Sequence, residues 1–289
     1  MATDTALAHA TETTQEEQLW GGGKSPFKAS YGKLMMWYFL LSDAFTFAGF
    51  LISYGALRFS SVTWPLPDFV FAKTPFMEDT KLPLVFVTFM TFVLIASSVT
   101  MVRAVQEGHR ENQKGVIFWM FLTILGGATF LSCQAWEWTN LIAGECMTVT
   151  TDPFGTHAEA GIYIEDEHGH PYENKADYVP FDEGDGYLIH QDHESGEWLK
   201  RKYVTPGDST PKELEFGPSA FGALFFFITG FHGFHVFSGV MFLLIILINV
   251  ASGLYASRKN GYEMVEKIGL YWHFVDLVWV FVFLVFYLL

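Results

Sequence analysis

The chain has 289 residues, of which 51% are hydrophobic and 18% aromatic, and its formal net charge is −14. This composition is far from that of an average soluble domain and indicates a membrane protein. The acidic balance argues against nucleic acid as a partner. The two cysteines, Cys133 and Cys146, form neither a disulfide framework nor a metal-ligand spacing.

The first 30 residues are polar and acidic and contain no apolar core of a signal peptide. We therefore expect residues 1–30 to form a flexible cytoplasmic tail that is not cleaved.

Five apolar segments follow, and each is long enough to cross a bilayer core of about 30 Å, which takes about 20 residues. They are residues 34–57, 82–102, 115–138, 218–249 and 268–289. Lipid offers no hydrogen bonds to an exposed backbone, so each segment should be a helix. The sequence predicts an all-α integral membrane protein, a five-helix bundle with three helices in residues 31–143 and two in residues 217–289.

Every second connection between the predicted spans is rich in basic residues. Because cytoplasmic loops carry an excess of Lys and Arg, this alternation predicts the orientation of the chain in the membrane. The basic residues cluster before the first span, between the second and third, and between the fourth and fifth: Lys24, Lys28, Lys33; Arg103, Arg110, Lys114; Arg258, Lys259, Lys267. The N-terminus should then be cytoplasmic, and the C-terminus should lie on the outer face. The outer connection at residues 58–81 contains Trp64 and three prolines and should be an ordered turn-rich segment.

The second outer connection, residues 144–216, is a large acidic insert with 17 Asp and Glu against 5 Lys and Arg. It therefore carries −12 of the net charge. Two stretches, AGIYIEDEHGHPYE and GYLIHQDHESGEWLKRKY, predict β-hairpins. Its histidines could bind a metal with nearby carboxylates, although solvated loop residues are the favoured interpretation; they are His157, His168, His170, His190 and His193.

Six ionisable residues interrupt the predicted spans: Asp43, Glu137, His232, His235, His273 and Asp276. Ionisable groups are costly in hydrocarbon, so all six should face protein. Residues three apart share a helix face, which pairs His232 with His235 and His273 with Asp276. Both aspartates lie about 12 to 13 Å into the layer by the helical rise.

Three interpretations of the histidines remain open. His235 and His273 could clamp a haem between two helices, or the histidines and carboxylates could relay protons. The third and favoured interpretation is a structural hydrogen-bond network between helices. Gly230, Gly233 and Gly239 should permit close helix contact there, and four tryptophans near predicted helix ends should be interfacial anchors: Trp37, Trp136, Trp138 and Trp272.

Several motifs in order resemble subunit III of the haem–copper terminal oxidases. They are SDAFTFAGF, VQEGHRENQKG, CQAWEW, TGFHGFHV and YWHFVDLVWVFVFLVFY. The resemblance covers about residues 31–143 and 216–289 and includes five-helix as well as seven-helix members. The chain departs from the family at Asp43, where Glu is common, and in the acidic insert, which has no counterpart in short-loop members.

The resemblance implies a non-catalytic subunit of a proton-translocating cytochrome c oxidase in the bacterial inner membrane, which reduces oxygen to water in aerobic respiration. It implies no redox centre in this chain, with haem and copper in subunits I and II. The chain would pack on subunit I, bind phospholipid and support proton uptake. The six ionisable residues are the matched polar positions.

Other functions remain open at this point. The family also includes quinol oxidase subunits and accessory subunits of nitric oxide reductases, and the electron donor is selected on other subunits. A stand-alone haem-binding membrane cytochrome and a proton-coupled transporter are alternatives of other classes. The acidic insert could attract a basic cytochrome c or a neighbouring respiratory complex.

Overall fold

A computed structural model describes residues 30–73, 84–166, 169–174, 177–192, 196–255 and 261–289. Contacts divide the chain into residues 1–39 and residues 40–289. The first unit contains the start of the first helix, where Trp37 and Tyr38 are each 60% exposed. All architecture and contacts described below lie in the second unit.

In the part of the chain that the structure describes, five helices are long and apolar enough to span a membrane, as the sequence predicts. They are α2 (Tyr31–Ser60), α4 (Val85–His109), α5 (Gln113–Thr139), α6 (Ser219–Ala251) and α7 (Glu263–Phe283). Single π-helical turns extend two of them, η1 (Asn140–Gly144) after α5 and η3 (Leu284–Leu288) after α7. Most helices run past the predicted spans because a helix continues through polar turns that hydropathy does not detect.

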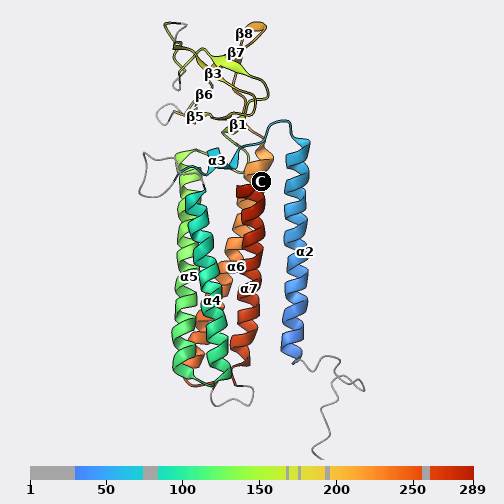
Figure 1. Cartoon of the computed structure of the whole chain (residues 1–289), viewed down its shortest axis with the longest axis vertical. Helices are drawn as coiled ribbons and strands as arrows, with labels where there is room; N and C mark the ends of the chain where they lie inside the picture. Colours follow the sequence, from blue (N-terminus) through green and yellow to red (C-terminus); the bar gives the residue numbers. More distant parts are fainter. Residues whose placement is uncertain (1–29, 74–83, 167–168, 175–176, 193–195, 256–260) are drawn as a thin grey trace, which may run out of the picture. The chain divides into compact units, whose positions relative to one another are not determined.

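Four helices pack as a ring in which α4 contacts α5 and α7, and α6 also contacts α5 and α7 (Figure 1). Trp272 is fully buried in this ring, and its indole Nε1 donates to Ser97 Oγ at 3.1 Å. Gly127 and Gly239 make room for its ring, since a Cβ at either position would lie within 3.0 Å of it. The prediction that Trp272 is an interfacial anchor is therefore wrong, because glycines on two facing helices create an interior space for it.

The part of α2 in the second unit contacts α6 and the end of α7 through aromatic rings. Ring centroids lie 5.1 Å apart for Phe47 and Phe231, and 4.2 Å apart for Tyr54 and Phe286. Aromatic pairs at these spacings add to the stabilisation from burial. This α2 segment is thus attached to α6 and α7 by side chains along two of its turns.

The first outer connection is ordered where the structure describes it. It contains the short helix α3 (Pro67–Val70), and the Trp64 indole donates to the Tyr54 hydroxyl at 3.1 Å. The Trp64 backbone N–H donates to Thr156 Oγ1 in the acidic insert at 3.2 Å. The remainder of the predicted turn-rich segment, residues 74–81, lies outside the described residues.

The described residues of the insert form eight short strands in three small sheets. They are β1 (Phe154–Thr156), β2 (Gly161–Tyr163), β3 (Val179–Phe181), β4 (Gly186–Leu188), β5 (His190–Gln191), β6 (Trp198–Leu199), β7 (Lys202–Thr205) and β8 (Asp208–Glu213). The largest sheet has the order β3-β2-β7-β8, and the two-stranded sheets are β1-β4 and β5-β6. Tyr163, Phe181, Ile189 and Leu214 form the buried core of the insert.

Both predicted hairpin segments contain antiparallel pairing. In the first, β2 leads into a bridge between Glu165 and Pro171; in the second, β5 pairs with β6. The sequence did not predict that β2 pairs with β7, or β1 with β4. These pairings join residues far apart in the chain, which local patterns cannot identify.

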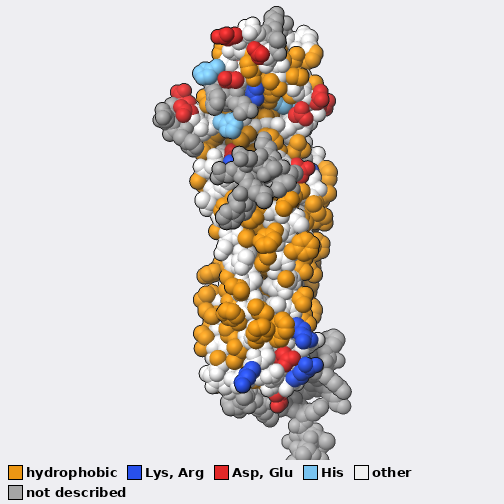
Figure 2. Space-filling view, turned by 60° about the vertical axis from the view of Figure 1, so that its left-hand side comes forward, with side chains coloured by type: hydrophobic (Ala, Val, Ile, Leu, Met, Phe, Trp, Pro, Cys, Tyr) orange, Lys and Arg blue, Asp and Glu red, His pale blue; other side chains and the backbone are white. Residues whose placement is uncertain are grey.

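Side-chain types separate along the molecule (Figure 2). On the face shown in Figure 2, hydrophobic side chains cover the helices and acidic side chains gather over the insert, while basic side chains gather with a few acidic ones at the opposite ends of the helices. The α4–α5 and α6–α7 connections lie at the same end, since the Gln113 amide donates to the Val250 carbonyl oxygen at 2.7 Å. This arrangement agrees with the alternation of loops expected for five spans.

Candidate functional site

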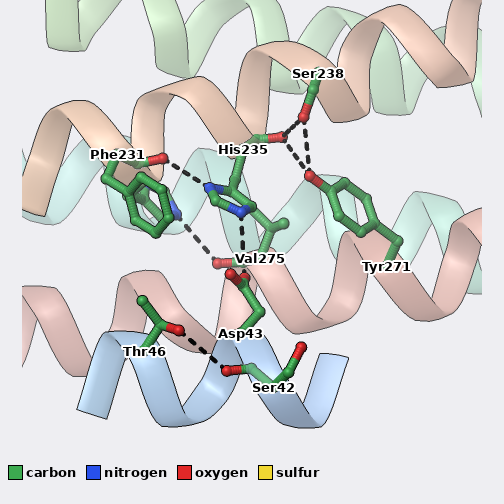
Figure 3. Close-up of polar contacts among 9 residues, drawn as sticks. Ser42, Asp43, Thr46, Phe231, His235, Ser238, Tyr271 and Val275 are labelled. Carbon is green, nitrogen blue, oxygen red and sulfur yellow. Dashed lines mark hydrogen bonds and ion pairs between the residues drawn. The ribbon is translucent and has the colours of Figure 1, made fainter. Parts of the chain in front are cut away.

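The clearest polar contact between helices joins Asp43 of α2 to His235 of α6 (Figure 3). Both residues are buried, and Asp43 Oδ2 lies 3.2 Å from His235 Nε2. His235 Nδ1 lies 2.8 Å from the Phe231 carbonyl oxygen. Because a carbonyl only accepts, Nδ1 carries a proton and donates, and Nε2 faces the carboxyl. One further proton held by either partner makes the pair neutral overall.

A hydroxyl cluster joins α6 to α7 beside this pair (Figure 3). The Tyr271 hydroxyl donates to the His235 carbonyl oxygen at 3.1 Å and lies 2.9 Å from Ser238 Oγ. Ser238 Oγ donates to the same carbonyl at 3.0 Å. These bonds fix the register of α7 against α6 at the level of His235.

His232 occupies a different environment, inside the four-helix ring. It is fully buried, and its Nε2 lies 3.1 Å from the Val275 carbonyl oxygen, to which it donates. Its ring lies edge-on to Phe130 and at a tilt to Trp279. Its Nδ1 is buried and has no hydrogen-bond partner among the described residues. His232 therefore acts as a packed ring with one backbone contact.

Glu137 lies where α5 meets η3. Its carboxyl oxygens accept from the Tyr287 hydroxyl at 3.0 and 3.2 Å and from the Gln134 amide at 2.9 Å. All three residues are buried. Hydrogen bonds of this kind offset part of the cost of burying a carboxyl group. The CQAWEW motif thus contributes both Gln134 and Glu137 to one contact between helices.

His273 and Asp276 lie next to α4. His273 Nδ1 lies 2.5 Å from Ser98 Oγ. The Ser98 hydroxyl also lies beside the Asp276 carboxyl. The two oxygens of that carboxyl are buried and accept no well-formed hydrogen bond from the described residues. Asp276 is 6% exposed, whereas His273 is only half-buried. His273 is thus the one residue of the six that departs from the expected burial.

The six residues do not form one continuous network. Their direct polar contacts form separate groups on different pairs of helices, and within the described residues no group of three metal-ligating side chains occurs. The geometry also disfavours the haem interpretation for His235, since its Nδ1 is bonded to its own helix and its Nε2 faces Asp43. The observed contacts can hold the helices together at several separate positions.

The sequence did not reveal several residues of these groups. Ser98, Ser238, Tyr271 and Tyr287 supply hydroxyls, but a hydroxyl in an apolar span has no pattern that marks a partner. Glu107 is buried in the last turn of α4, where Asn112 Nδ2 and Arg110 Nη1 from the α4–α5 turn donate to its carboxyl at 2.7 and 3.1 Å. The quoted loop motif contained all three residues but gave no sign that Glu107 organises the turn.

Asp152 and His157 are buried titratable residues of the insert whose pKa values burial shifts strongly. His157 is 5% exposed, stacks on Phe181 at 3.7 Å, and its Nε2 lies 2.6 Å from the Tyr163 hydroxyl. Burial lowers the pKa of His157 to about 4. Asp152 is 1% exposed, and burial raises its pKa to about 7 although the Phe154 N–H donates to it.

His157 is therefore not the solvated loop residue that the sequence favoured, because the aromatic core of the insert encloses it. His170 and His190 are exposed, as expected. His168 and His193 lie outside the described residues.

Comparison with known proteins adds sequence relationships to this geometry. A family model described as cytochrome c oxidase subunit III matches residues 211–289, which include α6 and α7. Subunit 3 of a cytochrome c oxidase from Alkalihalophilus pseudofirmus is 25% identical, with 89% of this chain and 85% of the relative covered. Subunit 3 of a quinol oxidase from Bacillus spizizenii is 24% identical, with 93% and 95% covered.

A third relative is more similar over a shorter stretch. A probable cytochrome c oxidase subunit 3 from Rickettsia prowazekii is 38% identical over 77 residues, which are 27% of this chain and 28% of the relative. The long alignments include relatives named for either of two electron donors, cytochrome c and quinol.

Proposed function

Because the chain belongs to the subunit III family of the haem–copper oxidases, we propose that it is the non-catalytic third subunit of a cytochrome c oxidase that reduces oxygen to water. The observation that carries this proposal is the match over residues 211–289, together with the packing of the motif residues there. His235 and Tyr271 within that range hold α6 and α7 together. A non-catalytic subunit that stabilises its neighbours needs its own helices held in a fixed register, as α6 and α7 are here.

In this role the polar groups between helices stabilise the subunit. The Asp43–His235 pair attaches α2 to α6, and Glu137 attaches α5 to η3. Each contact places a protonatable group inside the bundle, which also suits support of proton uptake by a neighbouring subunit. Haem and copper would reside in subunits I and II, and phospholipid would occupy apolar surfaces of this chain.

The protein is a multi-pass membrane protein, and we propose the bacterial inner membrane with a cytoplasmic N-terminus. The α4–α5 connection with Arg103, Arg110 and Lys114 would be cytoplasmic under the positive-inside rule. The insert and the C-terminus would then face outward. The insert would attract a basic electron donor such as a cytochrome c, or a basic surface of a neighbouring respiratory complex.

A quinol oxidase subunit is the second candidate. It is favoured by the Bacillus spizizenii relative, whose alignment covers 95% of that protein and 93% of this chain. The two candidates differ in the donor that the assembled complex oxidises, so activity of the complex with each donor separates them.

The proposal predicts that the chain purifies with a haem- and copper-containing oxidase core. An affinity-tagged chain should be solubilised from its native membranes in mild detergent, and copurifying subunits should be identified by mass spectrometry. We expect oxidase subunits I and II, a haem spectrum and oxygen consumption with reduced cytochrome c.

Expression of the tagged chain without those subunits provides the control, and it should give no Soret band. A Soret band from the chain alone would favour the stand-alone cytochrome. Purification from native membranes without an oxidase core would refute the subunit assignment, and oxidation of quinol in place of cytochrome c would select the second candidate.

A further inference from the structure

His273 is a half-buried ionisable side chain in the middle of a span. It lies ten residues after Glu263 and ten before Phe283, the bounds of α7. At the helical rise this places it about 15 Å from either end of the helix, within the hydrocarbon layer. The other five ionisable residues of the spans are buried in the protein.

One ring nitrogen of His273 has no hydrogen-bond partner among the described residues. Nδ1 is bonded to Ser98 Oγ at 2.5 Å, but Nε2 makes no hydrogen bond with any described residue and is not enclosed by them. Acyl chains contain no hydrogen-bonding groups, so Nε2 stays unpaired if lipid covers this face. Leaving a polar atom unpaired in hydrocarbon is unfavourable, and a polar group from another helix removes that cost.

Exposed hydroxyls on other described faces do not need a polar group from another helix. Thr46 and Ser53 on α2 donate to carbonyls of their own helix at 3.1 and 2.8 Å. Ser132 on α5 donates to the Ala128 carbonyl oxygen at 2.9 Å. Each of these side chains is satisfied by its own backbone, so lipid can cover it. His273 cannot be satisfied in this way, since its Nδ1 is already used on α4.

The surface around His273 is apolar and spans two adjacent helices. On α4, Ile95 and Val102 lie three residues before and four after Ser98, and they are 43% and 44% exposed. On α7, Leu277 and Val280 follow His273 on the same face and are 55% and 44% exposed. An apolar two-helix face with one polar atom near its centre matches the way transmembrane helices associate.

We propose that this α4–α7 face docks a transmembrane helix of another oxidase subunit, and that this helix presents a hydroxyl, amide or carboxyl group to Nε2 of His273. The inference rests on the proposed function for the identity of the partner, and it adds the face and the chemical group that is recognised. Lipid alone and a second copy of this chain are the competing occupants.

Photo-crosslinking in the native complex tests the face. A photoreactive amino acid is placed at Leu277 or Ile95, and the matched control position is Phe121 on α5, which is 54% exposed against 55% for Leu277. We expect adducts with a different oxidase subunit from Leu277 and Ile95, and no such adduct from Phe121.

The proposal is overturned if both test positions yield no protein adduct, if they yield only adducts with a second copy, or if Phe121 yields as much adduct with the other subunit. Copurification of the oxidase core is scored on the same samples. An intact core without the expected adducts refutes the face alone, whereas loss of copurification in the parent protein refutes the proposed function.

Variants of His273 test the polar contact. His273→Asn keeps a group at the Nδ1 position for Ser98 and removes Nε2, and His273→Gln keeps a polar group at the Nε2 position. For a single interhelical hydrogen bond we expect roughly tenfold less retention of the chain on the core after detergent washing for Asn. Gln and the control Ser132→Ala should behave as the parent. Equal retention of Asn and parent, or loss with Gln but not with Asn, would contradict the contact at Nε2.

Discussion

Two histidines three residues apart on α6 have different partners. His235 points to Asp43 on α2, while His232 points into the ring and donates to the backbone of α7. A separation of three residues rotates a side chain by about 60° around a helix, which is enough to reach different neighbours. Two residues on the same face of a helix therefore need not belong to the same site. The predicted pairing of His232 with His235 is not what the structure shows.

Asp152 and His157 predict opposite pH effects on the stability of the insert. Burial lowers the pKa of His157 from 6.5 to about 4, so its contribution is lost as pH falls from 6.5 toward 4. Burial raises the pKa of Asp152 from 3.8 to about 7, so its contribution is lost as pH rises from 4 toward 7. In the parent protein the two dependences nearly cancel across this window.

Single substitutions should reveal each dependence. In Asp152→Asn the stability of the insert should fall by about 2 kcal/mol between pH 6.5 and 4.5, and in His157→Phe it should fall by a similar amount as pH rises across that range. The measurement is hydrogen exchange of the β2 and β7 amides, corrected for intrinsic rates. Parallel pH profiles for the parent and both variants would show that the two groups are not buried in solution.

At the level of whole elements, glycines decide which helices approach closely. A Cβ at Gly127 of α5 would lie 2.5 Å from Trp272 and 2.8 Å from Val240, whereas a Cβ at Gly233 of α6 would have nothing within 4 Å. The close approach expected at Gly230 and Gly239 is present, with Trp138 and Trp272 as neighbours. At Gly233 it is absent among the described residues, so that expectation is wrong, because the space beside this position is open.

Alanine substitutions at Gly127 and Gly233 should therefore have opposite effects. Gly127→Ala should destabilise the bundle by about 1 to 3 kcal/mol through overpacking against Trp272. Gly233→Ala should be neutral or stabilising by up to about 1 kcal/mol, since Ala favours helix more than Gly does. Thermal unfolding of the purified complex, followed by tryptophan fluorescence, checks both variants. A lower melting temperature for Gly233→Ala than for Gly127→Ala would contradict the packing.

At the scale of the whole molecule, the insert presents acidic groups outward while its described basic groups are engaged within it. Arg201 lies over the Tyr163 ring at 3.8 Å, Lys202 pairs with Glu165 at 3.3 Å, and Lys212 approaches Glu159 at 3.8 Å. The fourth, Lys200, lies over the Phe216 ring. Exposed acids gather in the β3–β4 turn, which contains Asp182, Glu183 and Asp185.

Neutralising that turn should weaken the attraction of a basic electron donor. The triple variant Asp182→Asn, Glu183→Gln, Asp185→Asn should lower the rate of cytochrome c oxidation severalfold at low ionic strength, with little effect near about 0.5 M salt. The control is Glu111→Gln, an exposed acid at the opposite end of the helices. Stopped-flow oxidation across a salt series is the measurement, and identical salt profiles for the triple variant and parent would remove the insert from donor binding.

The sequence alone determined the five spans and the locations of the ionisable residues within them, because hydropathy and the 20-residue requirement act locally along the chain. It also located the acidic insert and two of its hairpin segments. Tertiary structure decided which groups meet: Asp43 with His235, Glu137 with Tyr287, and β2 with β7. Those contacts join residues from 40 to nearly 200 positions apart, so they depend on how helices and strands pack in space, which no local pattern encodes.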